Sequence, residues 1–143
     1  MENKTMVIDY YELTMSQGYF NSNKHKQDAY FDVFFRTNPF NGGYAVMGGL
    51  DEIIEYIKNF KITEEDIEYL REKNVYTEEF LEYLKNLRFE GDIYAIPDGT
   101  PIFPNEPVIT VKTNIIMAQL IETALLNNFN HGTLVTTAAK RIT

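Results

Sequence analysis

The sequence contains no cysteine and only two histidines, His25 and His131. The lack of cysteine excludes disulfide bonds, a thiol nucleophile and cysteine-bound zinc. Two histidines cannot make a multi-histidine metal site. His25 lies in a lysine-rich segment, where we expect it to be solvated. His131 stands beside Gly132, where a helix cap or a buried, hydrogen-bonded histidine is expected rather than a catalytic one.

Positive charge is also scarce. The chain has 13 basic and 21 acidic residues, a formal net charge of −8, and a pI near 4.7. A general nucleic-acid-binding protein would carry the opposite sign of charge, and an anionic membrane surface is disfavoured for the same reason. No apolar run approaches the length of a membrane span, and the first nine residues have no secretion signal. We therefore expect a soluble cytoplasmic protein with neither nucleic-acid nor membrane partners.

Apolar residues, in contrast, are plentiful. They make up 44% of the 143 residues, and aromatic residues make up 14%. A chain of this length and composition can bury a real core, so intrinsic disorder is not expected. The length corresponds to one domain, or to part of a larger protein.

The N-terminal third predicts a helix and then a strand. Residues 9–20 have apolar positions at helical spacing, and Asp9 can cap the first turn through its carboxylate. Residues 29–35 are rich in aromatic and β-branched residues, which is typical of a strand. Because almost every position in it is apolar, we expect both of its faces to be covered.

Three acidic helices are expected next, and they carry most of the negative charge. The first spans residues 51–61. Thr63 and Asp66 have the spacing of a capping box at the start of the second, and Thr77 can cap the third. We interpret the acidic residues as a solvated helical surface rather than a binding site.

In the last part of the chain the spacing of apolar residues changes from that of a helix to that of a strand. Short strands are expected at residues 91–96, 102–103 and 107–111, joined by turns and paired as antiparallel hairpins. A long helix follows over residues 114–129, is interrupted at Gly132, and continues on the same spacing. This order of elements predicts an α+β fold with helices packed on a small, mostly antiparallel sheet.

Two residues could take part in ligand binding. Tyr11 opens a helix, where its ring could stack on a flat heteroaromatic ligand or could instead be a core residue. Arg36 follows a strand and precedes a Pro/Gly turn. Its guanidinium could bind a carboxylate or phosphate, or could form an internal salt bridge to Asp32 or to the acidic helices. The residues alone leave both pairs of alternatives open.

Several segments resemble nicotinate phosphoribosyltransferases, in the same order along nearly the whole chain. The matching segments are DYYELTM (residues 9–15), FFRTNPFNGGYAV (34–46), GDIYAIPDGT (91–100), FPNEP (103–107), and QLIET with LLN (119–127). Agreement at five separate places is far more specific than one short motif.

The resemblance implies an enzyme that condenses nicotinate with phosphoribosyl pyrophosphate to give nicotinate mononucleotide, in NAD salvage. The reaction is coupled to ATP hydrolysis and uses Mg²⁺. Members of the family are longer than this chain and place an irregular α/β barrel after the N-terminal α/β domain. They work as homodimers in which the N-terminal domain of one subunit closes the barrel of the other. Residues 1–143 are then the N-terminal domain alone, truncated before the barrel and inactive by itself.

Two residues can be assigned roles by the resemblance. Tyr11 stands at the motif tyrosine whose ring stacks on the nicotinate ring. Arg36 stands where related enzymes bind the phosphates of phosphoribosyl pyrophosphate. Asp9 is expected to hold the start of the Tyr11 helix. The resemblance places no catalytic residue and no metal ligand in this chain, since the phosphorylated histidine of the family lies in the barrel.

A second hypothesis is a stand-alone, non-catalytic module that binds a partner chain. The two hypotheses differ in what the apolar side chains near the C-terminal end do, Leu134 and Val135 among them. In a fragment we expect them to be exposed, or to pair between copies, because their covering partner is missing. An exposed apolar patch there would mark a missing partner surface.

Overall fold

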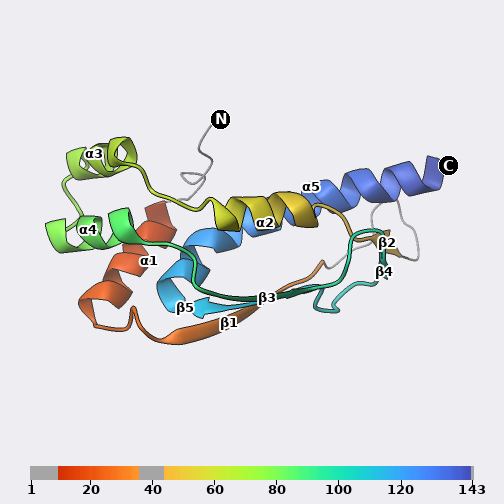
Figure 1. Ribbon diagram of the computed structural model, residues 1–143, viewed down its shortest axis with the longest axis horizontal. Coiled ribbons are helices and arrows are strands. Elements are labelled where there is room, and N and C mark those ends of the chain that lie inside the picture. Colours follow the sequence, from red (N-terminus) through yellow and green to blue (C-terminus); the bar gives the residue numbers. More distant parts are fainter. Residues whose placement is uncertain (1–9, 36–43, 143) are drawn as a thin grey trace.

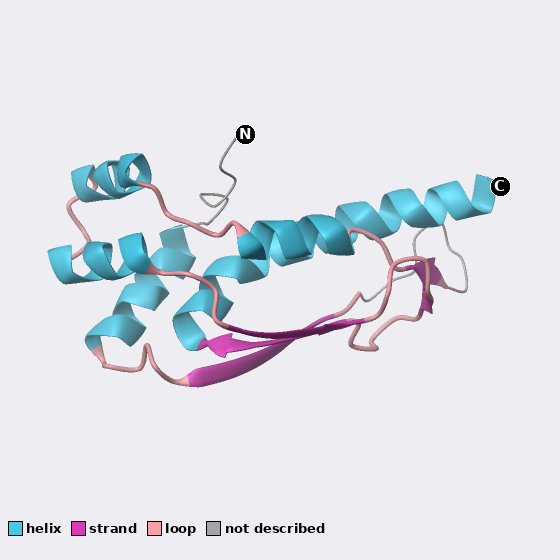
Figure 2. Cartoon of the chain, viewed as in Figure 1, coloured by secondary structure: helices cyan, strands magenta, loops and turns pink. Residues whose placement is uncertain are grey.

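The computed structural model describes residues 10–35 and 44–142. It is an α+β fold in which helices cover one side of a small sheet (Figures 1 and 2). The class expected from the sequence is therefore confirmed. The elements, in chain order, are α1 (Tyr10–Asn21), β1 (Asp28–Val33), β2 (Ala45–Val46), α2 (Leu50–Lys58), α3 (Glu64–Glu72), α4 (Glu78–Asn86), β3 (Gly91–Ala95), β4 (Pro101–Ile102), β5 (Ile109–Asn114) and α5 (Ile115–Ile142).

The main sheet has the order β1-β5-β3, and both of its pairings are antiparallel. Asp28 lies opposite Asn114, and Gly91 lies opposite Thr113. The short strand β4 does not join this sheet. It pairs with β2, which precedes the acidic helices in the sequence. The antiparallel pairing expected for the C-terminal strands is thus correct for β3 and β5, while β4 has a partner far away in sequence.

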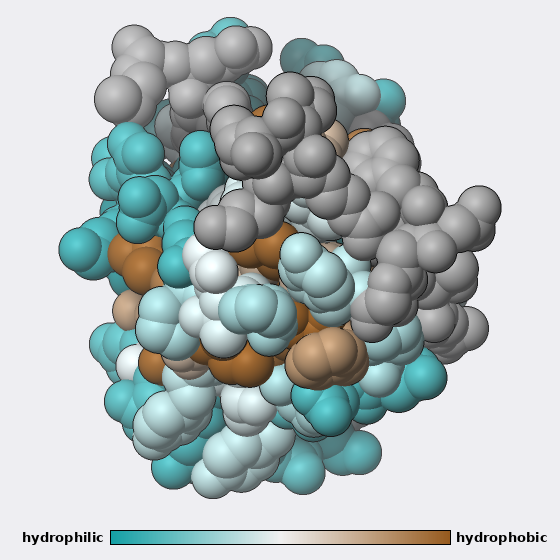
Figure 3. Space-filling view, turned by 90° about the vertical axis from the view of Figure 1, so that its right-hand side faces the viewer, coloured by the Kyte–Doolittle hydropathy of each residue, from teal (hydrophilic) through white to brown (hydrophobic). Residues whose placement is uncertain are grey.

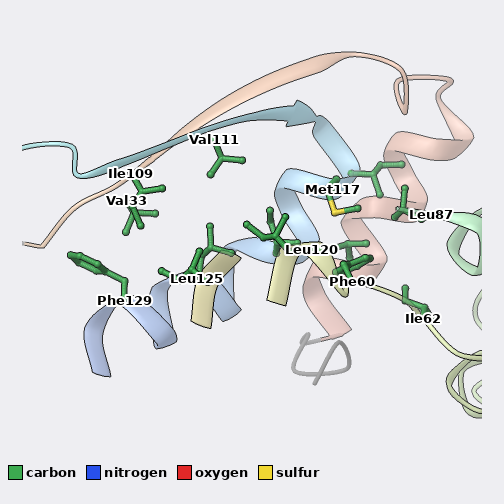
Figure 4. Packing of buried hydrophobic residues seen from close by; sticks show 14 of the residues in the cluster. Val33, Phe60, Ile62, Leu87, Ile109, Val111, Met117, Leu120, Leu125 and Phe129 are labelled. Carbon is green, nitrogen blue, oxygen red and sulfur yellow. The ribbon is translucent and has the colours of Figure 1, made fainter. Parts of the chain in front are cut away.

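The core lies between the main sheet and α5 (Figure 4). Val33, Ile109 and Val111 point from the strands toward α5, whose Leu125 and Phe129 meet them from the other side. The helices α1 and α2 pack in turn on α5. The long helix is therefore the central element against which both the sheet and the other helices are placed.

The outer face of the sheet is open. Tyr30 on β1 and Tyr94 on β3 are both exposed on it. The expectation that both faces of the first strand are covered is therefore wrong. The strand lies at an edge, and alternate side chains point away from the helices, as the two-residue period of a strand requires. Its aromatic residues are divided between the two faces, because Tyr30 is exposed whereas Phe31 packs against the core.

The helix α5 runs without a break past Gly132, so the predicted interruption is also wrong. Gly132 lies against the backbone of the segment before α2. A Cβ atom at Gly132 would be 2.5 Å from Gly49 Cα and 2.6 Å from Gly49 N. Gly48 and Gly49 therefore pack closely against the backbone of α5. Gly132 is glycine because another backbone passes there, not because the helix ends.

Local sequence signals at the helix ends are confirmed. Thr63 Oγ1 accepts from Asp66 N at 3.2 Å, and Asp66 Oδ2 accepts from Thr63 N at 3.1 Å, which makes a reciprocal capping box. Thr77 Oγ1 accepts from Phe80 N at 3.2 Å at the start of α4. Such caps satisfy N–H groups that have no partner within the helix.

The two histidines are placed differently from the expectation. His25 is half-buried, and its ring centre lies 5.0 Å from that of Phe20 and 5.4 Å from that of Tyr83. It is therefore part of a ring cluster between α1 and α4 rather than a solvated loop residue. His131 is exposed on the outer side of α5, in the middle of the helix, and is neither a cap nor a buried group.

Candidate functional site

The first turn of α1 presents Tyr11 to solvent. The residue is 70% exposed, whereas Leu13 is buried in the core. Successive residues of a helix are about 100° apart, so α1 can bury one side of this turn while it holds Tyr11 outside. Of the two alternatives that the residues left open, the core tyrosine is excluded. The ring is available to a ligand or to another protein surface.

The residue next to Tyr11 is a buried carboxylate. Glu12 is 5% exposed, and its Oε1 accepts a hydrogen bond from the hydroxyl of Thr123 on α5. The Ser16 hydroxyl, one turn further along α1, donates to the backbone oxygen of Glu12 at 2.8 Å. A buried charge is costly unless it is hydrogen-bonded. This pairing therefore fixes the first turn of α1 to one place on α5.

A third helix reaches the same cluster. Burial raises the pKa of the Tyr56 hydroxyl on α2, and the negative charge of Glu12 raises that pKa further. The Tyr56 hydroxyl has no hydrogen-bond partner among the described residues. Tyr56 therefore stays protonated over the physiological pH range, as a neutral group near the carboxylate. The cluster joins α1, α2 and α5 behind the exposed Tyr11.

The second half of α1 is held by Gln17. Its side-chain amide donates to Val75 O at 3.0 Å and accepts from Thr77 N at 2.8 Å. These two bonds tie α1 to the segment that opens α4. The helix that carries Tyr11 is therefore fixed at two points, by Glu12 and by Gln17.

Reasoning from the sequence missed the cluster around Glu12. The available signal was an acidic residue next to Leu13 on the side of the helix that faces the core. Thr123, likewise, lies in the part of α5 that matches the family segment QLIET. Nothing local in the sequence indicates that these two side chains meet across 111 positions.

Asp9 and Arg36 lie outside the described residues, so their predicted roles stay predictions. Asp32, one possible partner for Arg36, is exposed on β1. Its Oδ1 accepts from the Thr110 hydroxyl at 2.7 Å.

A groove of about 520 Å³ lies elsewhere, between α2 and the segment that leads into β3. Its lining is mostly apolar, with Lys58 and Arg88 as its charged residues. Arg88 already donates to the backbone oxygen of Leu87 at 2.7 Å. Neither Tyr11 nor Glu12 lines this groove.

In the part of the chain that the structure describes, no three His, Asp or Glu side chains come together as metal ligands would. Over the same residues, no helix is both long and apolar enough to cross a membrane.

The C-terminal part of α5 carries exposed apolar side chains. Leu134 is 46% and Val135 is 53% exposed. Figure 3 looks onto this end of the molecule, where hydrophobic side chains reach the surface between polar ones. The apolar exposure expected there from the sequence is present at these two residues.

Comparison with known proteins gives consistent matches. The sequence model of the nicotinate phosphoribosyltransferase N-terminal domain matches residues 6–130. The chain is 46% identical over 138 residues to nicotinate phosphoribosyltransferase of Bacillus subtilis, covering 96% of this chain and 28% of that protein. It is 40% identical over 138 residues to nicotinate phosphoribosyltransferase 2 of Arabidopsis thaliana, covering 95% of this chain and 25% of that protein.

Solved structures agree. The crystal structure of human nicotinic acid phosphoribosyltransferase superposes with a TM-score of 0.88 at 31% identity, covering 95% of this chain and 28% of that one. A nicotinate-nucleotide pyrophosphorylase from Pyrococcus furiosus superposes with a TM-score of 0.63 at 20% identity, which shows a shared fold. The chain spans about a quarter of the length of the curated relatives that it matches. By sequence and by fold, the chain belongs to the nicotinate phosphoribosyltransferase N-terminal domain family.

Proposed function

We propose that this chain is the N-terminal domain of an enzyme that condenses nicotinate with phosphoribosyl pyrophosphate to nicotinate mononucleotide, for NAD salvage. The observation that carries the proposal is Tyr11, whose ring is exposed at the start of a helix that is fixed at two points. An exposed aromatic ring on a fixed support suits a flat heteroaromatic substrate. The names and the identity of the relatives support the same reaction.

The roles proposed for the two site residues follow from the charges that develop in this reaction. Positive charge develops on the ribose and negative charge on the departing pyrophosphate. A fixed cation stabilises the departing charge, and a stacked ring holds the pyridine nitrogen in line for attack. We assign stabilisation of the departing charge to Arg36 and stacking on the pyridine ring to Tyr11. Asp9 is proposed to cap the helix that carries Tyr11. A chain of net charge −8 needs a specific cation for pyrophosphate.

Replacing Tyr11 by alanine in the full-length enzyme is expected to raise the KM for nicotinate about tenfold, with little change in thermal stability. Stacking of an aromatic side chain on a base contributes about 1–3 kcal/mol, and about 1.4 kcal/mol corresponds to tenfold. Steady-state kinetics with varied nicotinate measures the effect. Tyr69→Ala on α3 is the control, because Tyr69 is also exposed. An unchanged KM in Tyr11→Ala would reject the stacking role.

Replacing Arg36 by alanine is expected to raise the KM for phosphoribosyl pyrophosphate about tenfold or more and to leave the KM for nicotinate nearly unchanged. A hydrogen bond to a charged group contributes about 1.5–3 kcal/mol. Arg36→Lys should recover only part of the loss, because lysine keeps the charge and loses the two-pronged geometry. Full activity of Arg36→Ala at low phosphoribosyl pyrophosphate would show that Arg36 serves another purpose.

The remaining parts of the proposal lie outside the described residues. We place ATP, Mg²⁺ and the phosphorylated histidine with a barrel domain, and we propose a cytoplasmic homodimer in which that barrel meets this domain. The exposed apolar residues Leu134 and Val135 support a covering surface of this kind. On its own, the chain is proposed to be inactive.

The second candidate is an interaction module without catalysis, which would use the same exposed apolar residues to bind a partner chain. Under this second candidate, the Tyr11 ring binds no small-molecule ligand. A longer protein with no nicotinate-dependent activity, in which Tyr11→Ala changes only binding to another chain, would favour this candidate over the enzyme.

A further inference from the structure

We propose that Glu12 is a positioning residue for nicotinate binding. Its buried carboxylate, held by Thr123 of α5, fixes the first turn of α1 and so sets where the neighbouring Tyr11 ring stands. The inference rests on the proposed function, because it assigns to Glu12 the placement of the ring that we propose to stack on nicotinate.

The geometry supports this role in two ways. Glu12 and Tyr11 share one helical turn, but Glu12 is 5% exposed and Tyr11 is 70% exposed. Any shift of the Glu12 backbone therefore moves the Tyr11 backbone with it, while the two side chains face opposite environments. The partner of Glu12 is also on a rigid element, since Thr123 lies inside the long helix on which the sheet packs.

A charged residue at position 12 restricts how α1 packs on α5 more than an apolar residue would. A buried apolar side chain at this position would pack against α5 without specifying one register between the two helices. A carboxylate that must meet a hydroxyl can do so in only a narrow range of positions, because hydrogen bonds weaken steeply with distance and angle. The hydrogen bond between Thr123 and Glu12 thus restricts the first turn of α1 to one position on α5.

Thr123→Val in the full-length enzyme tests the inference, because valine keeps the shape of threonine and removes the hydroxyl donor. We expect the KM for nicotinate to rise about fivefold, with kcat and the KM for phosphoribosyl pyrophosphate unchanged, since small misplacements of a binding group weaken productive binding. Thr123→Ser, which restores a hydroxyl, should return the KM to its original value. A residue with only a structural role would not show this split and rescue.

Thr133→Val is the matched control on the same helix. Thr133 is buried whereas Thr123 is half-buried, and the Thr133 hydroxyl has no hydrogen-bond partner among the described residues. We expect this variant to keep the original KM for nicotinate. Glu12→Met is the second test variant, in case Thr123→Val lowers the yield of folded enzyme. It roughly keeps the length of the side chain and removes the oxygen that accepts from Thr123, and it should raise the same KM.

The decisive comparison adds Thr123→Val to Tyr11→Ala. If Thr123 acts through Tyr11, the second substitution should raise the nicotinate KM no further, whereas independent effects would multiply. Multiplying effects, or an unchanged KM in both Thr123→Val and Glu12→Met while Tyr11→Ala raises it, would overturn the positioning role and leave the proposed function standing. An unchanged KM in Tyr11→Ala itself would overturn the stacking role, and the positioning role with it.

Discussion

Gly132→Ala is expected to destabilise the domain by at least about 2 kcal/mol, because forcing extra atoms into a packed site typically costs about 1–3 kcal/mol and sometimes more. The atoms in the way belong to the backbone of Gly48 and Gly49, which cannot rotate aside as a side chain could. Alanine elsewhere in a helix would be favoured over glycine by about 1 kcal/mol, so this site should reverse the usual sign.

Thermal unfolding followed by circular dichroism measures the effect, and the midpoint should fall by roughly 6–10 °C. Gly18→Ala in α1 is the matched control, because a Cβ atom there would meet nothing within 4 Å. That substitution should stabilise the domain by roughly 0.5–1 kcal/mol. A Gly132→Ala variant as stable as Gly18→Ala would show that α5 does not lie against the segment before α2 as described.

Phe80→Ala is expected to cost about 3–5 kcal/mol of unfolding free energy, the range for removing a fully buried aromatic side chain. Phe80 is 0% exposed on α4. Its ring centre lies 5.7 Å from that of Phe20 on α1 and 6.0 Å from that of Tyr76. The loss would leave a cavity where α4 meets the helix that carries Tyr11.

Denaturant titration measures this cost, with Phe103→Ala as the control for the same chemical change. Phe103 is 48% exposed, so its removal should cost less than about 1 kcal/mol. Similar losses in the two variants would contradict the burial of Phe80 between α1 and α4.

The sequence predicted those parts of the fold that depend on neighbouring residues. The capping box at Thr63 and Asp66 and the cap at Thr77 are local hydrogen-bond patterns, and they were correct. Pairings between distant segments were not predictable in the same way. The pairing of β4 with β2 and the contact of Gly132 with Gly49 are set by the three-dimensional path of the chain. A glycine inside a helical pattern has the same local signal whether the helix ends or another backbone passes.

The candidate site shows the same division. The motif around Tyr11 marked the residue, and the structure added that its ring is exposed. The buried Glu12–Thr123 pair could not be found from periodicity, because a glutamate on a short helix normally faces solvent. Only the packing of α1 on α5 makes this carboxylate an internal one.

The reaction itself gives the most direct test of the proposed function. The measurement is the formation of nicotinate mononucleotide, followed by mass spectrometry, when the full-length protein is given nicotinate, phosphoribosyl pyrophosphate, ATP and Mg²⁺. We predict that the product appears with an equal amount of pyrophosphate and that Tyr11→Ala slows its formation at low nicotinate. Absence of the product with folded wild-type enzyme, or equal rates for wild type and Tyr11→Ala at low nicotinate, would contradict the account.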